Sequence, residues 1–379
     1  MPERKRTRLA AERVADLIQT LAGRGYTVIG PTVRDGAVVY EEIADAQDLP
    51  RGWTDRQEPG RYRLEPRADG AWFGYNLGPQ SWKRHLFPPQ TKLFTAERAD
   101  GLFRILGPEA ERRPRAFIGV RACELAAIAA QDQVLLEGPF RDGLYAARRE
   151  GVFIVAVSCT LAAPTCFCAS LGTGPQAPGE LCDIVLTEVV NGADHWFLAE
   201  AEGARGAEVL DRLAAEPCTE DDSRRAGAAV YAAAQSQTRR VDCDGLREAL
   251  EDNFEHDRWD AVARRCLACG NCTMVCPTCF CTTMEDFSDV EGSRAERWRR
   301  WDSCFTATFS YIHGGSVRTS VKARYRQWLM HKLATWIDQF GTPGCVGCGR
   351  CITWCPVGID LTEEARAICR DGNDGNTVA

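Results

Sequence analysis

The sequence lacks the signatures of most enzymes that bind a nucleotide or a small organic substrate. No G-x-G-x-x-G run follows a predicted strand and no Walker A motif occurs, which argues against a dinucleotide or nucleoside triphosphate site. Neither a Ser-His-Asp arrangement nor a catalytic zinc helix is evident. These absences leave the chain without an expected site for flavin, nicotinamide or substrate.

Long hydrophobic runs are also missing. No stretch approaches the roughly 18 apolar residues that a membrane span needs. The basic start, MPERKRTRLAAERVADL, has no apolar segment of the kind that secretory signals carry. The net charge of −7 disfavours a nucleic-acid-binding protein. We therefore expect no membrane span and no nucleic-acid partner.

Cysteine, in contrast, is abundant, with 19 in 379 residues. The pattern Cys-x-x-Cys-Gly-x-Cys-x-x-x-Cys-Pro occurs twice, at 266–277 and at 345–356. This spacing is typical of runs that hold [4Fe–4S] clusters, in which the first three cysteines bind one cluster and the fourth binds the other. The predicted ligands of cluster 1 are Cys266, Cys269, Cys272 and Cys355, and those of cluster 2 are Cys345, Cys348, Cys351 and Cys276. Two joined clusters predict transfer of single electrons.

Other uses of these cysteines fit less well. Structural zinc prefers two separated cysteine pairs and four ligands in total. A disulfide framework is disfavoured because the cysteine count is odd, the chain is long and nothing indicates secretion. Gly270 and Gly349 give the backbone room to wrap a bulky cluster. Reduced thiols and oxygen-sensitive metal chemistry together predict a cytoplasmic location.

A chain of this length is expected to form two domains. Residues 1–245 are predicted to form an α/β domain whose first stretch is α+β. The apolar runs Ala116–Val120 and Val152–Val157 predict buried parallel strands. Shorter strands are expected at 26–30, 37–43, 61–65 and 71–76, a helix at 9–22 and a surface loop at 216–227.

Residues 246–379 are predicted to form an α-helical ferredoxin-like domain that carries both cysteine runs. Apolar residues recur at helical spacing from Val321 to Phe340, between the two runs, and Gly341 ends this pattern. A strong helix between the runs favours a helical arrangement over a compact ferredoxin that contains a β-sheet.

Cysteines outside the runs include a repeated pentapeptide, Pro-Thr-Cys-Phe-Cys, at 164–168 and 277–281. Ligands of open α/β sheets lie at the carboxyl ends of the strands, where Cys123 and Cys159 are predicted. A third [4Fe–4S] cluster at this edge would be held by Cys123, Cys159, Cys166 and Cys168. An alternative also stays open, in which Cys279, Cys281 and Cys304 share this task with thiols of the first domain.

Five long strings carry a resemblance to a known family: 119–132, 164–175, 266–283, 300–318 and 326–360. They resemble the beta, iron–sulfur subunit of cytoplasmic sulfhydrogenases, which are soluble NADP-linked [NiFe] hydrogenases. The electron-donating iron–sulfur subunit of anaerobic sulfite reductase is a near relative. The first hundred residues match only loosely, and Ala122 stands where the family more often has proline.

The resemblance implies a heterotetramer in which this chain relays electrons and does no bond chemistry of its own. Its partners would be a flavoprotein subunit that binds FAD and NADP(H), and the small and large subunits of a [NiFe] hydrogenase. The family's beta and gamma subunits are also credited with reducing sulfur or polysulfide. The alternative function is that of the electron-donating subunit in an anaerobic sulfite reductase, which a neighbouring gene for a sirohaem protein would indicate.

Overall fold

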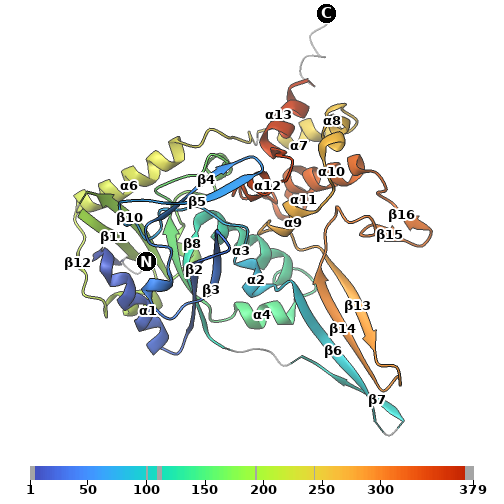
Figure 1. Cartoon of the computed structure of the whole chain (residues 1–379), viewed down its shortest axis with the longest axis horizontal. Helices are drawn as coiled ribbons and strands as arrows, with labels where there is room; N and C mark the ends of the chain where they lie inside the picture. The colour runs from blue at the N-terminus through green and yellow to red at the C-terminus, as the bar shows by residue number, and fades with distance from the viewer. Residues whose placement is uncertain (1–4, 100, 109–112, 193, 243, 372–379) are drawn as a thin grey trace, which may run out of the picture.

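The computed structural model describes residues 5–99, 101–108, 113–192, 194–242 and 244–371. Its main sheet has the strand order β12-β1-β11-β10-β9-β8-β2-β3 (Figure 1). The strands are β1 (Lys5–Ala10), β2 (Thr27–Arg34), β3 (Ala37–Glu42), β8 (Arg115–Arg121), β9 (Phe153–Ser158), β10 (Ile184–Asn191), β11 (Asp194–Ala201) and β12 (Glu216–Pro217). Strands β2, β8, β9 and β10 pair in parallel, and the outer strands pair antiparallel.

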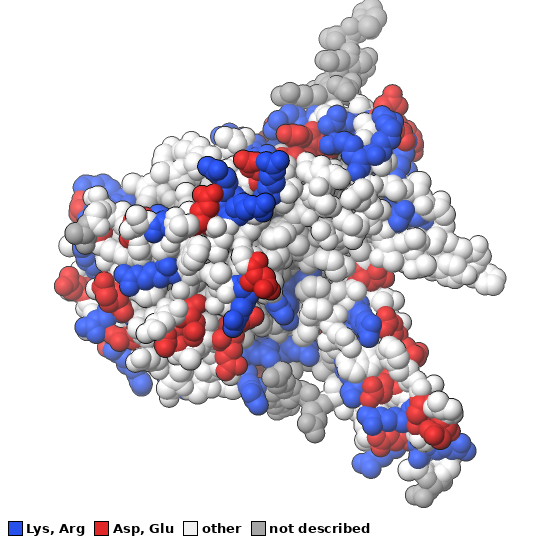
Figure 2. Space-filling view, in the orientation of Figure 1, with Lys and Arg blue, Asp and Glu red and all other residues white. Residues whose placement is uncertain are grey.

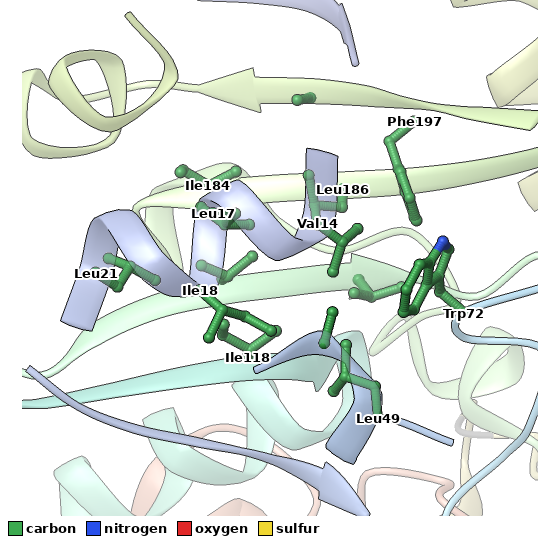
Figure 3. Packing of buried hydrophobic residues seen from close by; sticks show 14 of the residues in the cluster. Val14, Leu17, Ile18, Leu21, Leu49, Trp72, Ile118, Ile184, Leu186 and Phe197 are labelled. Carbon is green, nitrogen blue, oxygen red and sulfur yellow. The ribbon is translucent and has the colours of Figure 1, made fainter. Parts of the chain in front are cut away.

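Helices cover both faces of the parallel centre, which explains its nearly continuous apolar runs. Ala116 and Ile118 of β8 pack into the core that contains α1, whereas Phe117 and Val120 pack into the core on the α3 side. Figure 3 shows α1 lying over the sheet with its apolar side chains pointing at the strands. The helices are α1 (Val14–Gly23), α2 (Lys83–Leu86), α3 (Ala122–Leu135), α4 (Gly143–Arg149), α5 (Ala204–Leu210) and α6 (Glu220–Gln235). The two predicted parallel strands are confirmed as β8 and β9.

The predicted strand at 71–76 is wrong, because these residues form a buried loop. Side chains take the place of a neighbouring strand. The backbone N–H groups of Trp72 and Phe73 donate to the Glu188 carboxylate at 2.6 and 2.8 Å. The carbonyls of Phe73 and Tyr75 accept from Arg121, each at 2.8 Å. Buried backbone groups need partners, and here buried charged groups supply them.

Most of the other local predictions are confirmed. The helix at 9–22 corresponds to α1 and a preceding 3₁₀ turn, Ala11–Arg13, and the strands at 26–30 and 37–43 to β2 and β3. The strand at 61–65 is β5 (Arg61–Pro66), which pairs with β4 (Trp53–Glu58). The loop predicted at 216–227 is wrong for most of its length, because Glu216–Pro217 form β12, and Thr219 and Asp222 form a capping box that starts α6 at Glu220.

A second sheet, which we call the arm, projects from the body of the molecule (Figure 1). Its strand order is β13-β14-β6-β7. The strands are β6 (Gln90–Ala99), β7 (Leu102–Leu106), β13 (Thr282–Ser288) and β14 (Arg294–Trp301). Strand β14 pairs with β6, so the arm joins segments from both sides of the boundary predicted near residue 245. That boundary stays a prediction, but residues 246–379 are not helical throughout.

The C-terminal helices enclose a separate apolar core. They are α7 (Leu246–Asp252), α8 (Arg258–Arg265), α9 (Asn271–Met274), α10 (Val321–Met330), α11 (Trp336–Phe340), α12 (Arg350–Thr353) and α13 (Leu361–Asp371). The predicted helix from 321 to 340 is confirmed, with a π-helical segment, His331–Thr335, between α10 and α11. Gly341, with φ +71°, ends it. Within the described ranges, every helix is too short or too polar to span a bilayer.

Candidate metal centres

The two cysteine runs fold in the same way. In each run a glycine in the left-handed region, with φ +76° at Gly270 and +74° at Gly349, precedes a short helix. The third cysteines, Cys272 and Cys351, lie in the first turns of these helices, α9 and α12. A residue with a Cβ atom rarely adopts such a φ. The glycine that follows the second cysteine is therefore required by the backbone.

The cysteines predicted for cluster 1 lie together, although Cys355 comes from the second run. Burial raises the pKa of the Cys272 thiol, and repulsion from Cys266, Cys355 and Cys269 raises it further. Cys269 is exposed to solvent, and Cys266 is partly buried. This group therefore reaches the protein surface.

The cysteines predicted for cluster 2 form a second, more deeply buried group. Burial raises the pKa of the Cys351 thiol, and repulsion from Cys345, Cys348 and Cys276 adds to it. Burial also raises the pKa of Cys345 to about 12. Burial raises the pKa values of Cys345, Cys348 and Cys351, so these thiols stay protonated unless a metal cluster takes them as thiolates, whereas contact with Cys279 and the charge of Lys332 lower the pKa of Cys276.

A third group forms at the carboxyl ends of β8 and β9, as the sequence predicts. Burial raises the pKa of the Cys168 thiol to about 12, with repulsion from Cys159 as the next cause. Burial also raises the pKa of Cys166, and repulsion from Cys168 and Cys159 raises it further. The pKa of Cys123 is raised by burial and then by repulsion from Cys168. The structure thus brings together Cys123, Cys159, Cys166 and Cys168.

Two polar side chains that sequence reasoning missed contact this third group. Gln237 Nε2 donates to Cys168 Sγ at 3.3 Å, and Arg121 Nη1 points at Cys159 Sγ from 3.9 Å. Arg121 is buried and stands at the end of β8. A buried cation and an amide donor both favour the thiolate form. The sequence offered one signal for Arg121, which is its position two residues before the strand-end Cys123. It offered no signal for Gln237.

The third group lies directly against the second run. Phe167 N donates to Gly347 O at 2.9 Å, and Thr173 Oγ1 donates to Val346 O at the same distance. Cys348 of the second run is near enough to raise the pKa values of Cys123 and Cys168, after burial and closer cysteines. The three groups therefore form a continuous series of thiols.

Cys279, Cys281 and Cys304 do not join the third group in this way. Contact with the Cys276 thiol is the main cause that raises the pKa of Cys279, and contact with Cys281 is the main cause that raises that of Cys304. Lys332 is near all of these thiols, and its ammonium donates to Cys276 Sγ at 3.3 Å. The alternative ligand set for a third cluster gains no support from this geometry.

The donor sets do not fit a single metal ion. Among the described residues, no group of three or more His, Cys, Asp or Glu side chains is arranged to hold one ion. Around one zinc ion, sulfurs about 2.3 Å from the metal lie within about 4 Å of each other. A cubane cluster gives each thiolate its own iron and so accepts wider spacing. Groups of buried thiols beside buried cations therefore fit iron–sulfur clusters.

The fold and these thiol groups define an iron–sulfur protein. Residues 265–359 match the family described as "4Fe-4S dicluster domain". No solved structure matches the chain significantly. The chain is 33% identical over 346 residues to "Sulfhydrogenase 2 subunit beta" of Pyrococcus furiosus, an alignment that covers 89% of this chain and 92% of the relative. The chain belongs to the family of sulfhydrogenase beta subunits, as its resemblance in sequence implied.

Proposed function

We propose that this chain relays single electrons in the cytoplasm, between a flavoprotein subunit that binds FAD and NADP(H) and the small and large subunits of a [NiFe] hydrogenase. The observation that carries the proposal is the continuous series of thiols from exposed Cys269 to Cys159 beside the main sheet. Bound [4Fe–4S] clusters supply one-electron transfer. The chain supplies their ligands, their burial and the charges around them.

The proposed ligand sets follow the three thiol groups. Each of the first two sets draws its fourth cysteine from the other run, so neither cluster can form unless both runs are folded together. The sets are Cys266, Cys269, Cys272 and Cys355 for cluster 1, Cys345, Cys348, Cys351 and Cys276 for cluster 2, and Cys123, Cys159, Cys166 and Cys168 for cluster 3. Buried cations beside clusters 2 and 3, Lys332 and Arg121, offset thiolate charge and tune the potentials.

Exposed apolar residues support a place in a larger complex. Leu102 and Phe103 on the outer strand of the arm are 75% and 64% exposed, and Tyr311 and Ile312 of the β15 (Tyr311–Ile312) and β16 (Gly315–Ser316) hairpin are 64% and 61% exposed. In Figure 2 this hairpin is an uncharged projection, whereas both signs of charge are mixed over the arm and the body. Exposed apolar surface of this kind is typical of contacts with other proteins.

Replacing Cys269 with serine tests the relay. We expect NADPH-linked hydrogen turnover of the purified complex to fall by roughly 100-fold, because loss of a ligand costs at least as much as loss of a group that supports one. Hydrogen oxidation with an artificial dye that takes electrons at the small subunit should survive. Cys369→Ser, at a half-buried thiol in α13 with no neighbouring cysteine among the causes of its pKa shift, is the matched control. Survival of both activities in Cys269→Ser would refute the relay.

Replacing both Cys166 and Cys168 with serine tests the third cluster, because only two thiols, Cys123 and Cys159, then remain at this site. The anaerobically purified double variant should contain about four fewer iron atoms per chain than the wild-type protein, because one [4Fe–4S] cluster is lost. Inorganic sulfide should fall by the same amount, and both are measured chemically. An unchanged iron content would mean that this group of thiols holds no cluster.

The proteins that purify with the native chain test the partners. We expect a [NiFe] large subunit together with an FAD-binding subunit, whereas a sirohaem protein would indicate the sulfite reductase function instead. Sulfur or polysulfide reduction is part of the proposal only as an activity of the assembled complex.

A further inference from the structure

The base of the arm gathers three cysteines that none of the proposed clusters uses. Cys281 directly precedes β13 and Cys304 follows β14. This is the open end of the hairpin, where Thr282 pairs with Trp301 and Asp302 N donates to Cys281 O at 2.9 Å. Antiparallel pairing therefore holds these two thiols side by side, and Cys279 stands two residues before Cys281.

Lys332 is the charge that Cys279 and the Cys281–Cys304 pair have in common. Its side chain is buried, with the residue only 3% exposed, and its charge acts on Cys279, Cys281 and Cys304 alike. Its ammonium donates to Thr278 Oγ1 at 2.7 Å and to Gly344 O at 3.1 Å. Lys332 belongs to the π-helical segment, and such segments are frequent at functional sites.

A second buried lysine, Lys83, contacts the segment from Cys276 to Cys279. Lys83 donates to the carbonyls of Cys276 and Cys279 at 2.9 and 3.0 Å, and its ammonium lies 3.8 Å from the ring centre of Trp301. Neither Lys83 nor Lys332 forms an ion pair with a carboxylate in the part of the chain that the structure describes.

Two buried ammonium groups require negative charge nearby, since an uncompensated buried cation is strongly unfavourable. Cluster 2 supplies negative charge through Cys276 and Cys345. Cys279 and Cys281 are the other thiols whose charge favours the two ammonium groups. A [4Fe–4S] cluster on three thiolates carries net negative charge, because the thiolates bring more negative charge than the oxidised core brings positive.

The pentapeptide repeat gives an independent reason. Pro-Thr-Cys-Phe-Cys supplies Cys166 and Cys168 to the third group, and the second copy supplies Cys279 and Cys281 here. Both threonines are buried and bonded: Thr165 Oγ1 to Thr353 Oγ1 at 2.9 Å, and Thr278 Oγ1 to Gly344 O at 2.7 Å. The same local sequence thus anchors two sets of thiols, one through Thr353 in the second run and the other through Gly344, directly before that run.

We propose that Cys279, Cys281 and Cys304 hold a fourth [4Fe–4S] cluster, one iron of which has no cysteine ligand. The site adjoins cluster 2 through Cys276 and cluster 1 through Cys272, which is among the charges acting on Cys304. It depends on the proposed function only in taking Cys276 as a ligand of cluster 2. A cluster here would give the relay a side branch at the base of the arm.

Iron content tests this site. Cys281→Ser and Cys304→Ser, purified anaerobically as full chains, should each contain about four fewer iron atoms and four fewer sulfides than the wild-type protein. Cys369→Ser, which changes a thiol outside all four groups, should keep the wild-type content. Wild-type iron content in both Cys281→Ser and Cys304→Ser would overturn the proposal.

A combined variant separates this site from the alternative in which Cys304 serves the third cluster. Two independent clusters predict that Cys166→Ser and Cys168→Ser together with Cys304→Ser lose about eight iron atoms per chain. If one cluster uses thiols of both sites, the combined variant loses only about four, and the proposal fails.

The protein that carries both Cys166→Ser and Cys168→Ser decides the matter if Cys281→Ser and Cys304→Ser do not fold. With the fourth cluster it should keep about twelve iron atoms per chain, because clusters 1, 2 and 4 remain. A content of about eight would show that only the two clusters of the ferredoxin runs remain, and would refute the fourth. Either result leaves the electron relay through clusters 1 and 2 unaffected.

Discussion

Replacing Gly347 with alanine is expected to destabilise the protein by about 3 kcal/mol or more and to lower the iron content of both cluster 2 and cluster 3. Gly347 has φ +61°, and a Cβ there would lie 2.6 Å from Cys168 N and Cα and 2.7 Å from the carbonyl carbon of Phe167. These are backbone atoms, so neither side can yield without moving the segment that carries two cysteines of the third group. The hydrogen bond from Phe167 N to Gly347 O is lost with that movement.

The midpoint of chemical unfolding and the iron content of the anaerobic protein measure this effect. Gly341→Ala is the matched control, because Gly341 has φ +71° but a Cβ there would meet no atom within 4 Å. The control should lose only the cost of a left-handed alanine, about 1–2 kcal/mol, and keep all of its iron. If Gly347→Ala behaves like the control, the second run and the third group do not depend on this close contact.

The features that the sequence predicted correctly are those written in local periodicity or spacing. Each apolar run that became β8 or β9 is short, continuous and bounded by turns, which is what a strand buried on both faces requires. The helix from 321 to 340 repeats apolar residues on one face. The fold brings the fourth cysteine of each run to the first three of the other run, as the spacing indicates, and the assignment of these cysteines as cluster ligands stays a prediction.

The features that the sequence did not predict depend on partners far away in the chain. The loop at 71–76 resembles a strand in composition, but Glu188 and Arg121 satisfy its backbone in place of a neighbouring strand. The arm pairs β14 with β6 across roughly two hundred residues, and nothing in either strand specifies the other. A boundary drawn from composition could not include such a pairing.

Lys332 is different, because the sequence held a signal for it. It lies three residues after Leu329 and four before Trp336, both of which are buried on the apolar face of the predicted helix. A lysine on such a face must find negative charge or strong acceptors. The position of Lys332 on an apolar face therefore indicates, from the amino-acid sequence, that it has a buried partner. The structure shows that its partners include Cys276 and Thr278.

Replacing Arg350 with methionine is expected to lower the free energy of unfolding by about 3–5 kcal/mol, because it leaves a buried carboxylate without its partner. The side chains of Arg350 and Glu124 are each 1% exposed and form an ion pair. Arg350 also donates to the carbonyls of Gly78 and Gln80 at 2.9 and 2.7 Å, and Glu124 accepts from Trp82 N at 3.0 Å. This one side chain connects α12, and with it Cys351, to two segments of the N-terminal half, the loop at 78–80 and α3.

The double variant Arg350→Met with Glu124→Gln separates lost charge compensation from lost packing. Removing both charges should recover a large part of the stability, because buried ion pairs are often replaceable by neutral groups whereas a single buried charge is not. Arg34→Met, which breaks the exposed pair with Glu41, should cost far less, because solvent screens a surface ion pair. Chemical unfolding of the anaerobic proteins gives all three values. If Arg350→Met costs no more than Arg34→Met, the Arg350–Glu124 pair does not fix the cluster-bearing half to the main sheet.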